Sequence, residues 1–453
     1  MNAEIGMTVQ LNHGRGLGRS SILSAEVFAP PMQGIIDSWA SLGNDGWNWD
    51  SLRGFYDKSY TYPSISKSSW ETLGFGSRAA DDPWFNGSVG AFINLASVDP
   101  TSREKSKAAN CYCDPIKHRK NIYVLCNATL KKILFKEGST KAIRLQYHHD
   151  SIAKSVTARK EVIIAAGALQ SPKILELSGI GNRDILVQHG IDAIKDLPGV
   201  GEGLKDHLVV DLGFEAEALE TRDSIIRREP DAVRWAIAEY TADRTGILTS
   251  SGILTYAYMP VDTFPSHDGH QRLRTLLEEN RPKKGDLEGR ELARALAFYG
   301  VAEKALLGPT MPSGVYISSL GQNPLESDPV TGQRTFKPLP GKHLVSNPVN
   351  IEIFAEHMLY LESLASSSPL SGLLKRPPKP PRSISHLADL EGAKEYIRTR
   401  ATSMVHGVEN LRVVDSSIIP VLPPGNFQST LYADTERAAW LIKSEYRLKC
   451  GNV

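Results

Sequence analysis

Residues 161–181 read EVIIAAGALQSPKILELSGIG, and the fold is best inferred from this stretch. It opens with the short apolar run 162–166, which is too short for an ordinary helix and therefore predicts a buried strand. Gly167 follows, and then apolar residues at helical spacing with Pro172 in the first turn, where its missing N–H is tolerated. Ser178-Gly179-Ile180-Gly181 ends the predicted helix. A strand, a glycine turn and a helix in succession let backbone N–H groups approach a ligand closely.

Length and composition indicate an ordinary globular protein. The chain has 453 residues, enough for two or three domains, with 41% hydrophobic and 23% charged residues. Its formal net charge of +1 gives no reason to expect a nucleic-acid partner. Four cysteines are too few for a disulfide framework, and Cys111-Tyr112-Cys113 has no second pair at zinc spacing, so we expect no metal site. No apolar run reaches bilayer length and the N-terminus has no apolar signal segment, so we expect no membrane association and, by default, a cytoplasmic location.

The order and spacing of Gly167, Ser171-Pro172 and 178–181 resemble a signature of the glucose–methanol–choline (GMC) flavoprotein oxidoreductases. A generic βα unit would explain the strand and the helix, but not this order. Residues 407–430 resemble the family's C-terminal motif: a strand at Leu411–Val414 leads to Asp415, and a helix starts near Asn426. The resemblance extends over most of the chain.

The resemblance implies a fold of class α/β plus α+β. A discontinuous FAD-binding domain, Rossmann-like but incomplete, would comprise residues 1–30, 118–208 and 405–453. An antiparallel-sheet substrate domain flanked by helices would comprise residues 31–117 and 209–404. The sequence also predicts a strand at Asn121–Leu125, a β-meander after it, and helices over 232–241, 290–307 and 351–365. Trp47 and Trp49 are expected to be packing residues.

The resemblance also implies site residues and FAD as the cofactor. The positions that match the family's flavin-binding motifs are Gly14, Arg15, Gly18, Ser20, Ser21, Val124, Ala166, Gly167, Asp415, Asn426, Phe427, Gln428 and Ser429. Asn426 also matches the family's second active-site position, held by His or Asn, which hydrogen-bonds the substrate oxygen. Helix N-termini favour negative charge, and in the family this helix end faces the flavin pyrimidine ring.

Blocks of the family pattern are expected to be missing from the chain at three places, and one position departs from the pattern. Only 13 residues precede Gly14, so we expect the first βαβ unit, which carries the adenosine and pyrophosphate contacts, to be missing. Arg19 stands where the family has glycine. Further blocks are expected to be missing after Leu344 and after Met404, and the second of these would hold the family's catalytic histidine. His406 lies near that position but does not match it. The missing first unit and Arg19 predict weak FAD binding, and the missing histidine predicts very slow alcohol oxidation.

The function implied is that of an FAD-dependent oxidoreductase acting on the CH–OH group of a small organic substrate, with hydride transfer to the flavin. A non-redox lyase or cyclase on the same fold is one alternative, and an inactive truncated remnant is another. Turnover without an electron acceptor would identify the first, and the absence of any turnover would favour the second. The sequence leaves open the substrate, the electron acceptor and the oligomeric state. Asp206 and His207 resemble a catalytic pair, but adjacent residues in extended backbone point apart, so a structural role is expected.

Overall fold

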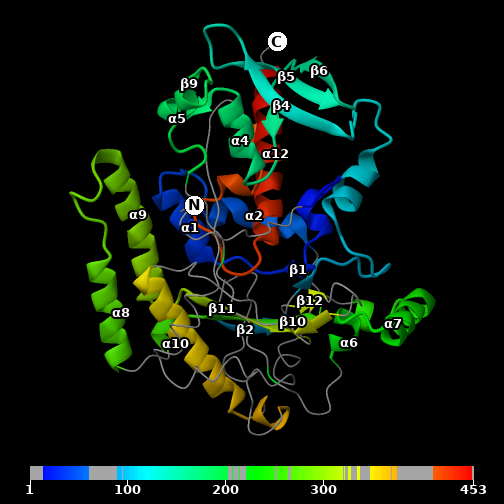
Figure 1. Cartoon of the computed structure of the whole chain (residues 1–453), viewed down its shortest axis with the longest axis vertical. Helices are drawn as coiled ribbons and strands as arrows, with labels where there is room; N and C mark the ends of the chain where they lie inside the picture. Colours follow the sequence, from blue (N-terminus) through cyan, green and yellow to red (C-terminus); the bar gives the residue numbers. More distant parts are fainter. Residues whose placement is uncertain are drawn as a thin grey trace.

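The computed structural model places two groups of elements along the long axis of the molecule, with α12 (Gln428–Cys450) running from the upper group toward the centre (Figure 1). The structure describes residues 14–60, 89–93, 95–202, 207, 214, 221–249, 252–263, 267–319, 321, 325–327, 334–336, 347–368, 370–374 and 412–450.

The predicted strand, turn and helix of residues 162–177 are present. Strand β7 (Ile163–Ile164) is followed by helix α4 (Gln170–Leu177). Strand β7 pairs in parallel with β14 (Arg412–Val413), the strand that precedes α12. Two βα units far apart in the sequence therefore lie side by side, with their strands pointing the same way. Strand β7 is shorter than predicted, and Ile164 is buried while Ile163 is half exposed.

An antiparallel meander covers this pair of βα units. It consists of β4 (Ala128–Phe135), β5 (Ala142–His149) and β6 (Ile152–Thr157), in the order β4-β5-β6. Its core is shared with β7 and α4 through apolar side chains that include Ile133, Ile164, Ile174 and Leu175. The hydroxyl of Ser178, at the end of α4, accepts a 2.8 Å hydrogen bond from the backbone N–H of Ile133. The predicted meander is thus confirmed.

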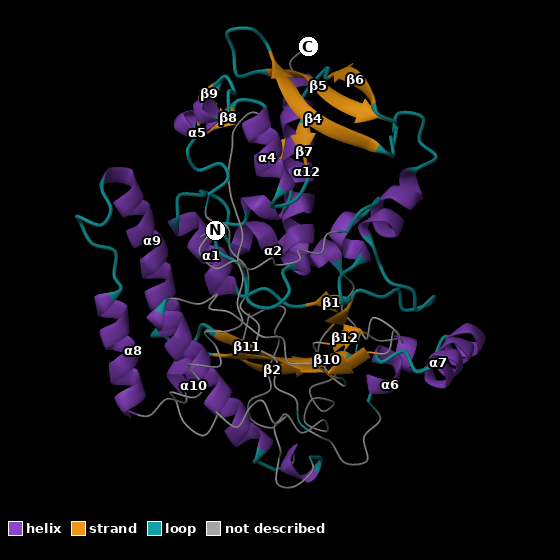
Figure 2. Ribbon diagram, viewed as in Figure 1, coloured by secondary structure: helices purple, strands orange, loops and turns teal. Residues whose placement is uncertain are grey.

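The lower part of the molecule contains a second antiparallel sheet, in the order β11-β10-β2. Its strands are β2 (Gly90–Ile93), β10 (Ile253–Met259) and β11 (Gly314–Ser319). Helices α8 (His267–Glu279), α9 (Gly289–Leu306) and α10 (Pro348–Ala365) stand beside it (Figure 2). Helices α9, α10 and α7 (Pro230–Asp243) confirm the three helices predicted from residue spacing, whereas α8 was not predicted.

Helix α2 (Trp49–Ser59) packs against α12, and α1 (Gln33–Ser41) packs against α2. Their shared core contains Ile36, Trp39, Trp49, Leu52, Tyr56, Ile419 and Ala433. Trp49 is buried and Trp47 packs at the edge of this core, as predicted. Both helices belong to segment 31–117, which the resemblance assigns to the substrate domain, although they share this core with the C-terminal helix of the other predicted domain.

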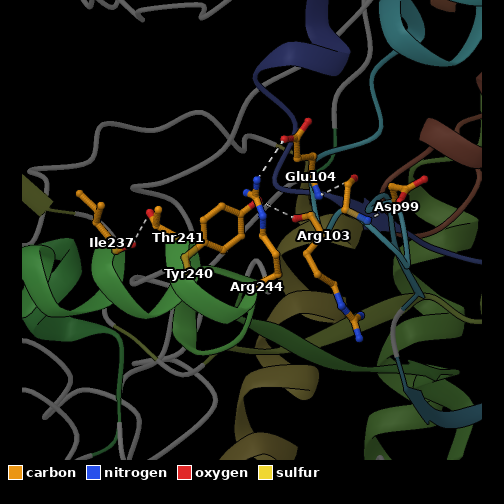
Figure 3. Close-up of polar contacts among 8 residues, drawn as sticks. Asp99, Arg103, Glu104, Ile237, Tyr240, Thr241 and Arg244 are labelled. Atoms are coloured by element: carbon orange, nitrogen blue, oxygen red, sulfur yellow. Dashed lines mark hydrogen bonds and ion pairs between the residues drawn. The ribbon is translucent and has the colours of Figure 1, made fainter.

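Helix α7 lies at one side of the molecule (Figure 1), and polar contacts join its C-terminal end to the 99–104 turn (Figure 3). The hydroxyl of Tyr240 donates a 3.1 Å hydrogen bond to the carbonyl of Arg103, and Arg244 lies 4.0 Å from the carboxylate of Glu104. Asp99 shapes that turn by accepting hydrogen bonds from the backbone N–H groups of residues 101 and 102.

The remaining described elements are short. They are β1 (Val27–Phe28), β3 (Leu95–Ala96), β8 (Ile180–Gly181), α5 (Arg183–Gln188), β9 (Lys195–Asp196), α6 (Asp223–Ile226), β12 (Leu325–Ser327) and β13 (Arg334–Phe336). Within the described part of the chain, no helix combines the length and the apolar character needed to cross a membrane.

Candidate functional site

The start of α12 forms one side of the candidate site. Gly425, just before it, has φ 72°, a backbone conformation that favours glycine. A Cβ at this position would lie 3.1 Å from the Tyr258 hydroxyl and 3.2 Å from the Cβ of Ala29, so the backbone can pack this closely only without a side chain. The Ser429 hydroxyl donates a 2.5 Å hydrogen bond to the carbonyl of Ala29. The first backbone N–H groups of the 23-residue helix have no partner within the helix and carry partial positive charge.

Two tyrosines of β10 reach this helix start from the lower sheet. The Tyr256 hydroxyl donates a 2.7 Å hydrogen bond to Oδ1 of Asn426. The Tyr258 hydroxyl lies 2.6 Å from the carbonyl oxygen of Pro30 and 3.2 Å from that of Pro424. Burial raises the pKa of both tyrosines well above its ordinary value, so both hydroxyls stay protonated and act as donors.

Asp415 joins the two βα units at the ends of their parallel strands. Its Oδ2 accepts hydrogen bonds from the Ser171 hydroxyl at 2.6 Å and from the Gly167 N–H at 2.9 Å. Its Oδ1 accepts one from the Ser417 N–H at 2.9 Å, and Ser171 in turn accepts a 3.1 Å hydrogen bond from the Ala166 N–H. These contacts engage both oxygens of the buried carboxylate within the chain. Asp415 thus holds the turn formed by Ala166 and Gly167, while the proposal that it binds a cofactor stays a prediction.

The predicted glycine-rich segment 14–21 folds as a tight turn against the end of β7. A Cβ at Gly14 would lie 1.9 Å from the carbonyl oxygen of Arg19, so only glycine fits there. Arg19 itself has φ 42°, and its guanidinium donates a 3.3 Å hydrogen bond to the Ala166 carbonyl. The structure therefore joins this turn to the Ala166–Gly167 block.

The far side of the same turn contacts α12. The Ser21 hydroxyl donates to the Gly18 carbonyl at 2.5 Å and accepts a 3.1 Å hydrogen bond from the Ala108 N–H. Ser21 also hydrogen-bonds Tyr432 of α12. Desolvation by burial raises the pKa of Tyr432, and the bond with Ser21 opposes this by a smaller amount. Arg15 and Ser20 are exposed on the turn. The turn, the end of β7, Asp415 and the first turns of α12 are thus connected.

Val124 is placed differently from the prediction. Residues 121–125 form no strand, and Tyr123, Val124 and Leu125 are 91%, 53% and 53% exposed. The apolar, β-prone composition of this run favoured a strand, but strand β4 begins only at Ala128 and the described chain offers residues 121–125 no pairing strand. The prediction of a strand at Asn121–Leu125 is therefore wrong, and the contact of Val124 with a cofactor stays a prediction.

Two residues of α12 have buried acceptor atoms that lack hydrogen-bond partners among the described residues. Gln428 donates through Nε2 to the Ser97 hydroxyl at 3.1 Å, whereas its Oε1 is buried and unpartnered. Both carboxylate oxygens of Asp434, two turns further along, are also buried without a hydrogen-bond partner. Desolvation raises the pKa of Asp434 well above its ordinary value, and the nearby charge of Arg437 only partly opposes this. An unpartnered buried acceptor calls for a ligand, a water molecule or a bound proton.

A cavity of about 280 Å³ lies beside α12, and Ser97 and Tyr432 are among its lining residues. Its other lining residues are Phe28, Lys58, Ser59, Ser106, Cys111, Tyr112 and Glu436. The Tyr112 and Tyr432 rings stack with their centroids 5.8 Å apart, so the cavity has an aromatic wall. No sequence pattern predicted this cavity, because its lining residues come from stretches far apart in the chain.

The imidazole of His207 packs edge-on against Phe427, with ring centroids 6.4 Å apart. This residue, for which the sequence predicts a structural role, lies next to the helix start that carries Asn426. His406, Asp206 and the junctions after Leu344 and Met404 lie outside the described residues.

Comparison with known proteins gives concordant results. Two family models described as GMC oxidoreductase match residues 4–209 and 399–434. A dehydrogenase of Monascus purpureus is 26% identical over 529 aligned residues, which cover 97% of this chain and 84% of the relative. Among solved structures, an FAD-dependent oxidoreductase from Chaetomium thermophilum superposes with a TM-score of 0.80 at 22% identity, covering 98% of this chain and 89% of that one. A fungal aryl-alcohol oxidase superposes with a TM-score of 0.75 at 21% identity, covering 96% and 86%.

These matches bear on the predicted gaps. Because the N-terminal family model matches from residue 4 onward, it does not support the prediction that the chain lacks the N-terminal dinucleotide-binding unit. The fold likeness extends over nearly the whole chain, but it does not confirm the incomplete Rossmann description. The alignment with the Monascus dehydrogenase is longer than the 453 residues of this chain, so the relative has residues inside the aligned region that this chain lacks.

Proposed function

Because the chain belongs to the GMC oxidoreductase family, we propose that it is an FAD-dependent oxidoreductase that oxidises the alcohol group of a small organic molecule. The observation that carries the proposal is the start of α12, where Asn426 stands at the positive end of a long helix and is held by Tyr256. The non-redox alternative is not favoured, since the matched family and the fold neighbours named above are oxidoreductases.

The residues at the start of α12 suit a flavin. The N–H groups of the first helical turn and the helix dipole favour the negative charge that a flavin pyrimidine ring gains on reduction. Oε1 of Gln428 is a buried acceptor that a ring N–H would satisfy. A Cβ built on Gly167 would meet nothing within 4 Å, so this glycine faces open space at the end of β7. We therefore propose that residues 14–21, 166–167 and 425–429 hold the flavin end of FAD.

The bound flavin supplies the hydride acceptor. The chain's own contribution is binding and orientation: the side-chain amide N–H of Asn426 donates a hydrogen bond to the substrate oxygen. As a general base takes the O–H proton, negative charge develops on that oxygen. A fixed N–H donor and the positive helix end stabilise this charge more than they stabilise the neutral alcohol, which is the condition for lowering the barrier.

The domain division is proposed as the family resemblance implies it, with residues 1–30, 118–208 and 405–453 binding FAD. The packing of α2 on α12, with α1 contributing to the same core, adds an extensive contact between this domain and segment 31–117. Asn426 lies where the two proposed domains meet, because Tyr256 belongs to the lower sheet and Asn426 to the segment just before α12.

The experiment is anaerobic reduction of the FAD-loaded protein by a panel of primary alcohols, including benzyl alcohols, followed as bleaching of the flavin absorbance. We expect at least one alcohol to bleach the flavin, and Asn426→Ala to slow this by about 10²–10³-fold. Thr435→Ala, a change at an exposed position of the same helix, is the matched control. If every alcohol leaves the flavin oxidised while a substrate turns over without any acceptor, the lyase reading replaces this one.

A further inference from the structure

Packing fixes the ring of Tyr256, whose hydroxyl contacts Asn426. Tyr256 is 1% exposed and sits directly opposite Phe92 in the β10–β2 pairing. Its ring stacks on the Phe92 ring with the centroids 5.9 Å apart, and Phe92 is itself fully buried. Tyr258, two residues along the strand and therefore on the same face, packs on the other edge of Phe92 at 4.9 Å. Packing of this kind leaves Tyr256 one rotamer and fixes the position of its hydroxyl.

The hydroxyl in turn selects one of two orientations of the Asn426 amide. An asparagine amide can rotate by half a turn, which exchanges its oxygen acceptor and its NH₂ donor. Among the described residues, Oδ1 of Asn426 is the one acceptor recorded for the Tyr256 hydroxyl, at 2.7 Å. Because this hydroxyl donates its proton to Oδ1, the amide oxygen is held toward β10 and both N–H groups remain available to a ligand.

We propose that Tyr256 is a positioning residue, whose hydroxyl fixes the Asn426 amide so that an N–H group faces the substrate oxygen. The inference rests on the proposed role of Asn426 in binding that oxygen. Tyr256 contacts neither substrate nor cofactor in this account and acts through Asn426 alone. Removal of its hydroxyl therefore lets the amide turn its acceptor toward the substrate, which weakens binding in the transition state.

The test is a double-mutant cycle on kcat/KM with the best alcohol of the panel. We expect Tyr256→Phe to lower kcat/KM about tenfold, the effect of roughly one hydrogen bond, and to have less than a twofold effect in an Asn426→Ala background. Equal losses in both backgrounds would overturn the inference, because they would mean that Tyr256 acts independently of Asn426. Asn426→Asp keeps an acceptor for Tyr256 but has no N–H donor, and should lose as much activity as Asn426→Ala.

Tyr258→Phe is the matched control. It removes a hydroxyl from the same face of the same strand, but the partners of this hydroxyl are the backbone carbonyls of Pro30 and Pro424. In an Asn426→Ala background, Tyr258→Phe should change kcat/KM by the same factor as in the wild-type protein, because the recorded partners of the Tyr258 hydroxyl do not include the Asn426 amide.

A second readout needs no turnover. With ¹⁵N-labelled asparagine, the side-chain amide signals of Asn426, assigned from their loss in Asn426→Ala, should shift in Tyr256→Phe and stay nearly unchanged in Tyr258→Phe. An unshifted Asn426 signal in folded Tyr256→Phe overturns the inference. A shifted signal in a protein that oxidises no alcohol would instead leave the positioning intact and refute the proposed function.

Discussion

The hydroxyl of Ser171 donates a 2.6 Å hydrogen bond to the carboxylate of Asp415, although 244 positions separate the two residues. This contact joins the turn after β7 to the residue after β14, and so keeps two βα units in register at the edge where ligands of α/β folds bind. The integrity of the proposed flavin site depends on it.

Asp415→Ala should therefore destabilise the whole protein. The change leaves the N–H groups of Gly167 and Ser417 and the Ser171 hydroxyl without their shared acceptor. We expect the free energy of unfolding to fall by about 3–5 kcal/mol, measured by urea denaturation. Asp114→Ala is the control, because its ion pair with Lys117 is on the surface and should contribute less than about 1 kcal/mol. Similar losses for both variants would contradict the role given to Asp415.

Gly425→Ala should disturb the start of α12. Its φ of 72° is unfavourable for alanine, and the new Cβ would press against Tyr258 and Ala29. We expect a lower melting temperature together with weaker FAD retention. Gly54→Ala provides the opposite control: Gly54 lies inside α2, and a Cβ there would meet nothing within 4 Å. That change should raise stability by about 0.5–1 kcal/mol.

Asp434 should make stability depend on pH. Its pKa is raised in the folded state by desolvation, so the folded protein holds a proton that the unfolded chain releases near its ordinary pKa of about 3.9. The carboxyl's contribution to stability is therefore complete below that value and declines as the pH rises toward the folded-state pKa. Asp434→Asn should flatten the melting temperature between about pH 4 and 7. If the melting temperature of the wild-type protein instead rose with pH over this range and Asp434→Asn removed that rise, the prediction would be contradicted.

His207→Asn and His406→Ala should each change the rate of alcohol oxidation less than twofold. The contact of His207 with Phe427 is a packing contact, and His406 stands outside the family's histidine context. Removing a general base typically lowers the rate by about two to four decades. A loss of that size in either variant, measured as single-turnover flavin reduction, would identify the base and refute the assignment.

Local sequence patterns predicted much of the architecture. Pro172 with the apolar residues after it marked α4, and the spacing in 351–365 marked α10, because helical periodicity is a local property. The bounds were less accurate: β7 covers only Ile163–Ile164, whereas the apolar run 162–166 predicted a longer strand. The run 121–125 has strand-like composition but forms no strand, since a strand needs a partner that composition does not specify.

The candidate site was only partly predictable. Asn426 and Gly167 came from motif resemblance, whereas Tyr256, Ser97 and the hydrogen bond of Arg19 to Ala166 did not. Tyr256 contacts Asn426 across 170 positions and Ser97 contacts Gln428 across 331. The residues around Tyr256 and Ser97 show no sequence pattern that indicates a partner so far along the chain. Such contacts depend on how β10 and α12 pack, which only the folded chain defines.

The central claim is that the block joining residues 14–21, 166–167 and 425–429 holds a flavin. Its most direct test is the FAD content of the purified chain after incubation with excess FAD and removal of the free cofactor. The prediction of weak FAD binding depended on Arg19 and on a missing N-terminal unit, and the family match does not support the absence of that unit. We predict a yellow protein with a stoichiometric amount of bound FAD, released on denaturation. A folded but colourless protein that retains no FAD would contradict the account.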